Sequence, residues 1–433
     1  MMIQKLYNLK KIQIDTFCIC LLFFLCIVFP FQFYILKIGL IGLFLIQSLN
    51  IKKLRKGLYK ERSTSGWWTG IFIFTNLFFI CLGEFHGNEA FRYYITTEFF
   101  WFILYSFIFL YIDIKIFFTL LRFIALASYV VLSLGILAFV QFNLFGKYNF
   151  LNFQAAARPG YPFIAIAGGS VTPMIFFGPL FLLFGINKIK SKIFVIFLIL
   201  FVIATSRRSF MLNIMLAPFF FILFYIFYVK EIKERKMIKN LIKNIFIVFF
   251  IIIISLLIYD YFTENFDLDL FIKFFKNAFK LSRSIEKNID NSSFERAKQT
   301  VALINGWKEH IIFGSGIAAN ASVVRSTTPG MYEMTYLAII FQRGIIGILL
   351  YLFQFLYLFS YLIYYGIKYR KIRNFCFSFC ASLICFMIAN GTNPYLEAFD
   401  YLWFIFLPFS IINLINRDPN QFIKVYLLYA NRR

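Results

Sequence analysis

The sequence predicts an all-α, polytopic membrane protein with about twelve transmembrane helices and one large polar loop. The chain has 433 residues, of which 61% are hydrophobic and only 15% are charged. A soluble domain is closer to a quarter charged. Apolar runs of about 20 residues follow one another, and each is long enough to cross a hydrocarbon core about 30 Å thick.

The apolar runs set the boundaries of the predicted helices. Between residues 1 and 262 we expect nine of them, at 16–31, 34–50, 67–83, 93–112, 120–143, 163–186, 193–206, 209–229 and 244–262. A large loop at 263–333 follows. The remaining part, 334–433, then holds three helices and a tail, with the helices at 335–365, 375–390 and 399–416.

The net charge of +24 follows the predicted topology. Basic residues gather before the first helix and after the second, sixth, eighth and tenth helices, as in Lys10, Lys52, Lys188, Lys236 and Arg370. Loops rich in Lys and Arg stay on the cytoplasmic side. We therefore expect both termini to be cytoplasmic and the large loop to face outward. The charge needs no nucleic-acid partner to explain it.

Cysteine and histidine usage argues against disulfide and metal chemistry. The seven cysteines lie in or at the end of apolar runs, where they act as small hydrophobic side chains. The two histidines, His86 and His310, lie in different loops without a partner at ligand spacing. No glycine-rich nucleotide loop is present. We expect neither a metal nor a cofactor.

Two helices are predicted inside the large loop. The first has apolar residues such as Phe271 and Phe275 on one face, and lysines such as Lys273 and Lys280 on the other. Such a helix lies in the membrane interface, in contact with anionic head groups. It could also lie alongside an anionic lipid substrate.

The second helix begins near Ser292, which forms a capping box with Glu295. Its expected packing face consists of Phe294, Ala297, Val301, Ile304 and Trp307. It ends before Gly314-Ser315-Gly316, a turn whose backbone can approach a ligand closely.

The outward arginines are candidates for binding an anionic substrate. Arg207 and Arg208 occupy a tight turn between two apolar runs, where a guanidinium matches the geometry of phosphate oxygens. Anchoring to lipid head groups by snorkelling is the alternative. Three further outward arginines join the set: Arg158, Arg296 and Arg325.

Glu333 is the candidate general base. It lies where the large loop meets the membrane, at a position where a carboxylate is costly to place. Eleven residues later comes Gly344-x-x-Gly347, a motif that lets two helices pack closely. The alternative is a solvated loop carboxylate at a helix start. Several arginines and one base indicate attack on a phosphate-linked substrate.

Three segments resemble the bacterial O-antigen polymerase and O-antigen ligase superfamily (Wzy and WaaL proteins). Residues 295–316, ERAKQTVALINGWKEHIIFGSG, carry the family's Arg, aromatic and Gly-x-Gly pattern. Residues 205–210, TSRRSF, resemble its Ser-Arg turn, and residues 393–408 resemble its closing segment. The predicted topology, with a dominant outward loop before the tenth helix, is also similar.

One motif separates the two branches. The ligase branch has His-[Asn/Ser/Gln]-x9-Gly-x-x-Gly-Thr, and in that register this chain has Glu333 in place of the histidine and Ile348 in place of the threonine. The polymerase branch is therefore favoured. Some polymerases carry Arg-x10-Gly and Arg-x9-Gly in two outward loops, and Arg158 and Arg296 fit these spacings.

The resemblance implies a metal-independent, GT-C-like glycosyltransferase of the bacterial inner membrane. It would join undecaprenyl-diphosphate-linked oligosaccharide repeat units on the periplasmic face into O-antigen or capsule. The arginines would bind the diphosphate, and Glu333 would activate the acceptor hydroxyl. Membrane lipids, and a chain-length regulator protein, are the partners implied. The alternatives are a ligase that transfers the glycan to lipid A-core, and a polysaccharide or lipid flippase.

Overall fold

The computed structural model describes most of the chain. The described residues are 14–48, 64–146, 149–156, 165–185, 189–205, 207–229, 291–324 and 328–431. The predicted helix at 244–262 and the amphipathic helix around Phe271 fall outside these ranges, as do Arg158 and Arg325.

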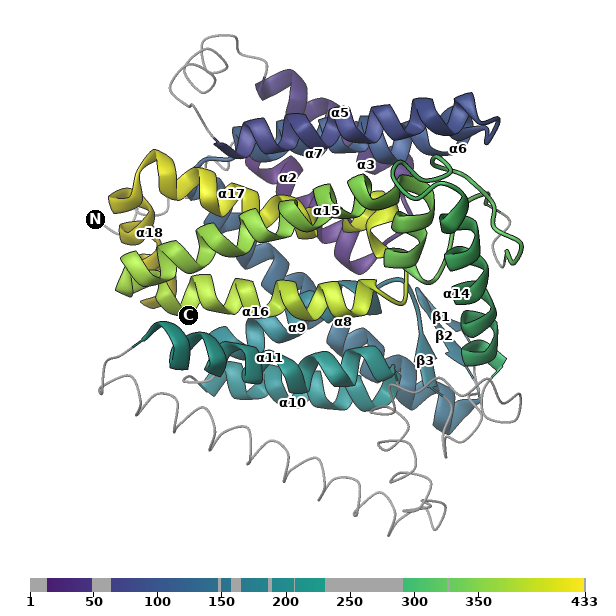
Figure 1. Cartoon of the computed structure of the whole chain (residues 1–433). Coiled ribbons are helices and arrows are strands. Elements are labelled where there is room, and N and C mark those ends of the chain that lie inside the picture. The colour runs from purple at the N-terminus through teal and green to yellow at the C-terminus, as the bar shows by residue number, and fades with distance from the viewer. Residues whose placement is uncertain are drawn as a thin grey trace.

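Long apolar helices run roughly side by side through the molecule (Figure 1). In the described part of the chain, six helices are long and apolar enough to cross a membrane, and four further apolar helices are shorter. The longest are α8 (Ile114–Phe145) and α15 (Thr335–Lys368), and both exceed thirty residues. This confirms the predicted all-α, multi-pass membrane protein.

The core forms where the first and last parts of the chain meet. Helix α2 (Ile14–Val28) packs on α8, while α16 (Arg373–Asn390) packs on α9 (Val171–Gly185) and on α11 (Arg208–Tyr228). Buried core residues also come from α3 (Tyr34–Ser48), α7 (Trp101–Tyr111), α10 (Ile189–Thr205), α15 and α17 (Trp403–Arg417). Helix α5 (Thr64–Phe85) packs partly buried residues against this core.

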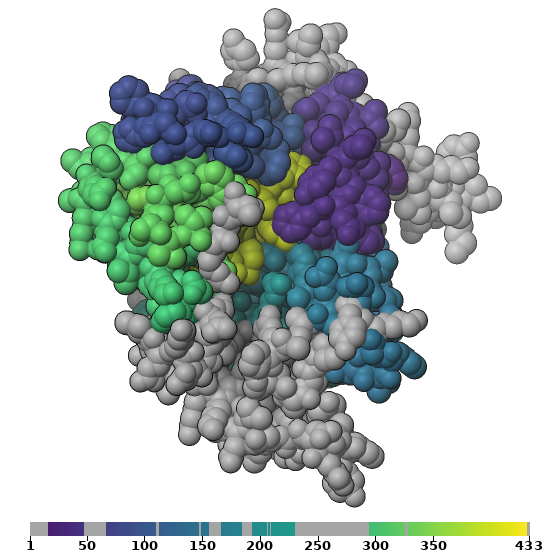
Figure 2. All heavy atoms as spheres, turned by 90° about the vertical axis from the view of Figure 1, so that its right-hand side faces the viewer, coloured from purple at the N-terminus to yellow at the C-terminus, as the bar shows by residue number. Residues whose placement is uncertain are grey.

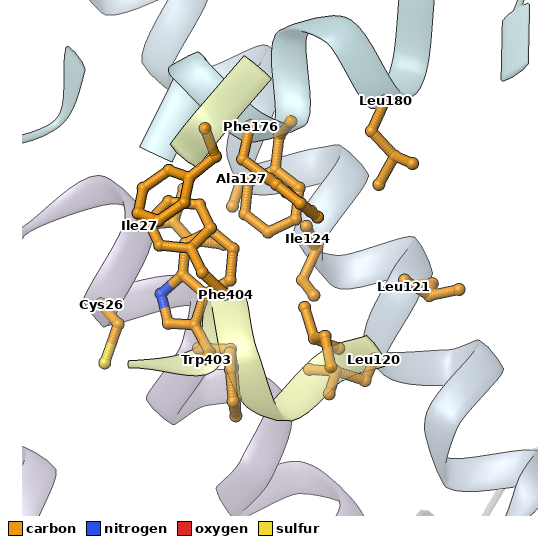
Figure 3. Close-up of a cluster of buried hydrophobic side chains, with 14 of the residues drawn as sticks. Cys26, Ile27, Leu120, Leu121, Ile124, Ala127, Phe176, Leu180, Trp403 and Phe404 are labelled. Atoms are coloured by element: carbon orange, nitrogen blue, oxygen red, sulfur yellow. The ribbon is translucent and has the colours of Figure 1, made fainter. Parts of the chain in front are cut away.

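Aromatic rings fill the centre of this core (Figure 3). Trp403 stacks on Phe177 with ring centroids 4.3 Å apart and planes within 8° of parallel. Phe176 meets Phe404 edge to face at 5.2 Å. Such pairs stabilise a core beyond the area that they bury. Six of the seven cysteines are buried and free, which agrees with their predicted role as small hydrophobic side chains.

Two predicted helices differ from the structure. The run at 93–112 is divided into α6 (Ala90–Tyr94), the π-helical η1 (Ile95–Phe100) and α7 (Trp101–Tyr111). The run at 163–186 becomes helical only at Val171. Its first residues form β3 (Ala165–Ala167) instead, which pairs with β2 (Phe153–Ala156).

The short sheet is antiparallel in the order β1-β2-β3, with β1 at Asn149–Phe150. Gly168 follows it and lies so close to the chain that a Cβ there would be 2.3 Å from the carbonyl oxygen of Asn152. The hydroxyl of Ser170 donates to the carbonyl of Val28 at 2.8 Å. These contacts keep the segment before Val171 out of the helix that its apolar residues predict.

The last part of the chain also departs from expectation. Residues 395–401 form two short 3-10 turns, η3 (Tyr395–Glu397) and η4 (Phe399–Tyr401), so α17 begins at Trp403 and not at 399. After η2 (Arg370–Ile372) and α16, the predicted tail is itself helical as α18 (Pro419–Asn431).

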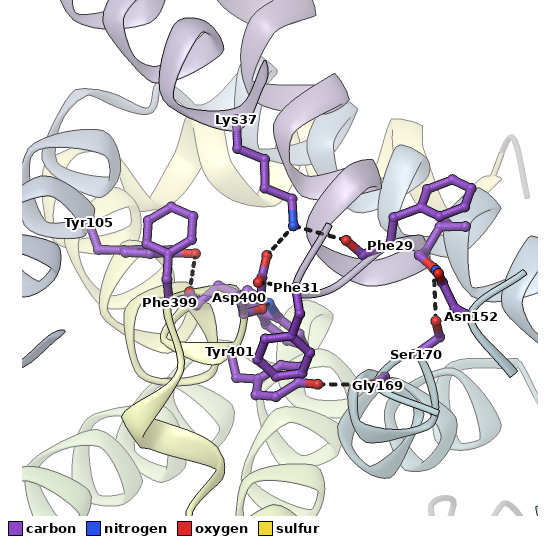
Figure 4. Close-up of polar contacts among 12 residues, drawn as sticks. Phe29, Phe31, Lys37, Tyr105, Asn152, Gly169, Ser170, Phe399, Asp400 and Tyr401 are labelled. Atoms are coloured by element: carbon purple, nitrogen blue, oxygen red, sulfur yellow. Dashed lines mark hydrogen bonds and ion pairs between the residues drawn. The ribbon is translucent and has the colours of Figure 1, made fainter. Parts of the chain in front are cut away.

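A buried ion pair connects the start of α3 to η4 (Figure 4). The Nζ of Lys37 is 2.6 Å from Oδ1 of Asp400, and both side chains are 1% exposed. Lys37 also donates to the carbonyl of Phe29 at 2.9 Å, and the N–H of Phe31 donates to Asp400. Phe31 has a φ of 63°, so this contact supports a left-handed turn that a large residue rarely adopts.

The two ends of the helix bundle are different. The sheet and α14 (Asn291–Glu309) lie at one end, where α15 begins, and α18 lies at the other end, where α15 finishes (Figure 1). Seen from the α14 end, yellow atoms of the C-terminal part of the chain lie between green atoms of α14 and α15 and the purple N-terminal helices (Figure 2). Which end faces outward stays a prediction.

Candidate active site

The helix that carries the predicted motif is broken at Gly344. This residue has φ 62° and ψ −164° inside α15, values that glycine adopts at little cost. The turn after α14 fills the break: the N–H groups of Ser315 and Gly316 donate to the carbonyls of Phe341 and Gln342, each at 2.9 Å.

The contact at the break is backbone against backbone. A Cβ on Gly344 would be 2.1 Å from the carbonyl oxygen of Ile312, and a Cβ on Gly314 would be 2.4 Å from the carbonyl carbon of Gln342. Gly344 was expected to let a second helix pack closely against α15. The segment that packs there is instead the turn after α14, and this turn holds α14 against α15.

Helix α14 begins at Asn291, close to the predicted start. Its packing face is rotated from the prediction, because Gln299, Ala302 and Leu303 are buried while Val301 is 57% exposed. Trp307 does pack on the cluster that includes Leu303. Sequence periodicity missed the face because Gln299, a polar residue, is fully buried.

Two predicted site residues meet at the end of the bundle. The Nε of Arg296, on α14, is 2.5 Å from Oε2 of Glu333, just before α15. The side chains are 27% and 29% exposed, so the pair is half-buried and open to a ligand. A charge-assisted contact of this length is strong.

A second cationic group is linked to this pair through Tyr395. Arg207 precedes α11 in an extended conformation, and its Nη2 donates to the carbonyl of Gly168 at 3.4 Å. The Tyr395 hydroxyl lies within hydrogen-bonding reach of the Arg207 and Ser209 side chains and interacts electrostatically with Arg296.

Tyr395 thus connects the two arginines, and residue-by-residue sequence reasoning missed it. It lies in the 393–408 segment that resembles the family's closing segment, and this resemblance is the sequence feature that could have identified it. Burial raises the pKa of its phenol, while Arg207 and Arg296 act in the opposite direction. The hydroxyl therefore remains protonated at neutral pH and can donate a hydrogen bond to an anion.

The side chains of the other three predicted site residues are not described by the structure. Arg208 is the first residue of α11, adjacent to Arg207, and its side chain is not described. Arg158 and Arg325 lie outside the described residues. Their proposed roles remain predictions.

A polar cavity lies beside the broken helix. Arg343 forms an ion pair with Glu98 of η1 at 3.0 Å and donates to Oδ1 of Asn76 at 2.8 Å. The cavity has a volume of about 50 Å³ and is also lined by Glu397 and Gln354. This is room for a few water molecules.

Glu397 is the second acid of this cavity, beside Glu98. Its Oε2 is buried and has no hydrogen-bond partner among the described residues. Burial, and secondarily Glu98, raise the pKa of Glu397 to about 8, although Arg343 acts in the opposite direction. Glu397 is therefore largely protonated at neutral pH, and no sequence feature indicates this.

The two histidines also come together. The rings of His86 and His310 are 5.5 Å apart, and Nδ1 of His86 lies 3.0 Å from the carbonyl oxygen of Ser315. Within the described ranges, no group of three or more His, Cys, Asp or Glu side chains has the arrangement of a metal site.

The fold and this site define a multi-pass membrane protein with two arginines, a tyrosine and a carboxylate at one end of its bundle. Residues 193–352 match the family model described as O-antigen ligase (Wzy_C), which confirms the resemblance to that superfamily. The matched segment includes Arg207, Arg296 and Glu333, whereas Tyr395 follows it. No curated protein matches the chain.

Chemically, this arrangement suits an anionic substrate that reacts with a hydroxyl. Arg207, Arg296 and Tyr395 can donate several hydrogen bonds toward phosphate oxygens. Glu333 can accept a proton from a hydroxyl. The site lies where apolar helices end, so a lipid-linked substrate can reach it from the membrane.

Proposed function

We propose that the chain is a glycosyltransferase that polymerises undecaprenyl-diphosphate-linked oligosaccharide repeat units on the periplasmic face of the bacterial inner membrane. The observation that carries the proposal is the ion pair between Arg296 and Glu333, together with Tyr395, which interacts with both Arg296 and Arg207. The family match over residues 193–352 supports the same class of chemistry.

The reaction would exchange one bond at the anomeric carbon. A hydroxyl at the non-reducing end of a new repeat unit attacks the anomeric carbon of the growing chain. The bond from that carbon to the diphosphate oxygen breaks, and undecaprenyl diphosphate leaves with the electron pair. The hydroxyl proton passes to Glu333.

The arginines would act on the leaving group. Negative charge develops on the diphosphate as the bond breaks, and fixed donors aimed at such charge provide the largest catalytic term in many enzymes. Two guanidinium groups supply this positive charge without a metal ion. Arg208, Arg158 and Arg325 are proposed to extend the same binding surface.

Substrate binding would also free the base. In the structure, Oε2 of Glu333 is occupied by Arg296. A diphosphate carries more negative charge than a carboxylate, so it competes for the same guanidinium. We propose that the donor draws Arg296 away and leaves Glu333 available to the acceptor hydroxyl, which couples donor binding to activation of the acceptor.

A ligase is the second candidate, because the matched family model is described as O-antigen ligase. A ligase uses the same donor and transfers the glycan to lipid A-core. The absence of the ligase-branch histidine, replaced here by Glu333, favours polymerisation. A chain-length regulator protein is a proposed partner of the polymerase only.

A deletion strain read on a polysaccharide gel separates the candidates. Loss of a polymerase leaves single repeat units attached to the acceptor. Loss of a ligase leaves a lipid-linked polymer and no attached glycan. Loss of a flippase leaves lipid-linked single units inside the cell, and this result would reject both transferase proposals.

A further inference from the structure

A second polar pocket lies at the far end of α15 from Glu333, where α15, α17 and α18 meet. Its volume is about 600 Å³, within the range of small-molecule sites. It is lined by Ser360, Tyr361, Tyr364, Tyr365, Lys368, Tyr369, Ile415, Asn416 and Pro419. Four of these nine residues are tyrosines.

The tyrosines form one continuous wall. Tyr361, Tyr365 and Tyr369 are spaced four residues apart, so they share a face of α15 and of the turn after it. Successive rings are 6.0 and 6.2 Å apart. Tyr365 is buried and its hydroxyl is bonded to Oδ1 of Asn416, which fixes the wall to the end of α17.

Lys368 supplies the positive charge of the pocket. Its Nζ lies 3.0 Å from the hydroxyl of Tyr364 and 5.2 Å and 5.4 Å from the ring centroids of Tyr364 and Tyr369. In the described part of the chain, no carboxylate forms an ion pair with Lys368. Asp418 lies between the lining residues Asn416 and Pro419 in sequence. Its carboxylate accepts a hydrogen bond from the N–H of Gln421 at the start of α18.

This combination of groups matches a phosphate. An ammonium and phenol hydroxyls all donate hydrogen bonds to phosphate oxygens, and tyrosines suit a site that is apolar on one side and wet on the other. Basic pockets between transmembrane helices bind anionic head groups.

We propose that this pocket binds the phosphate-bearing head group of an anionic phospholipid. The acyl chains would extend along the apolar flank of α15, where Leu352, Phe353 and Leu356 are exposed. The site lies at the opposite end of α15 from the proposed active site. It does not depend on the proposed function.

Binding can be measured on the purified full-length chain in a neutral detergent. Native mass spectrometry would compare adducts of phosphatidylglycerol and phosphatidylcholine, and glycerol phosphate would serve as the soluble phosphate probe. Lys368→Ala and Tyr364→Phe are the test variants. Lys371→Ala is the control, because it removes the same charge three residues away, outside the pocket.

Phosphatidylglycerol should bind more tightly than phosphatidylcholine, and Lys368→Ala should weaken it about fivefold, the change that corresponds to about 1 kcal/mol per lysine at a membrane surface. Tyr364→Phe keeps the ring and should weaken binding by a smaller factor. Lys371→Ala should have little effect.

Glycerol phosphate that binds as tightly as the lipid, with the same dependence on Lys368, would overturn the lipid as occupant and assign the pocket to a soluble phosphate compound. Equal binding of the two lipids would overturn the proposal. So would equal weakening by Lys368→Ala and Lys371→Ala, because that result reports general surface charge. Tyr364→Phe tests the pocket separately if the lysine variant fails to fold.

Discussion

Arg296 and Glu333 are 37 residues apart in the sequence, and their side chains form a half-buried ion pair 2.5 Å long. The pairing depends on the broken helix α15. The turn that fills the break at Gly344 holds α14 in place, and α14 then presents Arg296 to the residue just before α15. Changes at this break should therefore reach the proposed active site.

Glu333→Gln should lose most polymer formation. Glutamine keeps the size and hydrogen bonding of the side chain but removes the base, and general base catalysis typically contributes about 10²–10⁴-fold. Polymer length and yield, measured on a gel at matched protein levels, would report the loss. Glu89→Gln is the control, because Glu89 is an exposed carboxylate that also pairs with an arginine.

A partial result would also be informative. Glu333→Gln with substantial activity and Glu333→Ala with none would mean that Glu333 positions the acceptor. Normal polymerisation by the alanine variant would remove Glu333 from the mechanism and leave the arginines and Tyr395.

Arg207→Ala should reduce polymer formation by about 10²–10³-fold, the usual effect of removing one donor to developing negative charge. Arg208→Ala is expected to act similarly. Lysine at either position should restore activity only in part, because a point charge cannot form two parallel contacts with phosphate. Arg92→Ala is the control, at an exposed arginine. Full activity in both alanine variants would return these residues to membrane anchoring.

The sequence was a good guide to the helices and to one half of the site. Apolar runs define helices well, because each must bury its length in lipid or protein. The candidates Arg207, Arg296 and Glu333 lie at one end of the bundle, as a common site requires. The capping box at Ser292 also predicted the start of α14 to within a residue or two.

The remaining features depend on tertiary contacts. The strand at Ala165–Ala167 exists because Gly168 and Ser170 pack on residues far away in the sequence. No sequence pattern distinguishes Tyr395 and Glu397 from the other residues of their loop. The packing of that loop against other parts of the chain brings Tyr395 to Arg207 and Arg296 and buries the carboxyl group of Glu397.

The Lys37–Asp400 pair should be important for stability. Lys37→Met leaves a buried carboxylate without its cation, which typically costs about 3–5 kcal/mol. Replacing both residues, as in Lys37→Met with Asp400→Leu, should cost less than the two single changes together. Thermal unfolding in detergent would measure this. Additive losses would mean that the two charges do not stabilise each other.

The topology predicts which end of the bundle faces outward. A cysteine introduced at Asn291, at the start of α14, should react with an impermeant maleimide in intact cells, and one at Asn240 should react only after lysis. The endogenous Cys81 is exposed, so it must first be replaced. Labelling of position 240 from outside would contradict the predicted orientation and would place the proposed site on the cytoplasmic face.

Glu397 should make stability fall as the pH rises. Its pKa is raised from the ordinary 4.5 to about 8 in the folded chain, so between these values the folded state holds a proton that the unfolded state has released. The free energy of unfolding then decreases with pH across this window and levels off above it, by an amount on the order of 5 kcal/mol at most. Below about pH 4.5 Glu397 is protonated in both the folded and the unfolded state, and its contribution to the free energy of unfolding no longer changes with pH.

Glu397→Gln keeps the neutral form at every pH and should remove this slope. The variant should unfold at a higher temperature than the unchanged chain at pH 9 and at a similar temperature at pH 5. Glu89→Gln, at an exposed carboxylate, should leave the slope unchanged. An unaltered slope in Glu397→Gln would show that another group carries the proton.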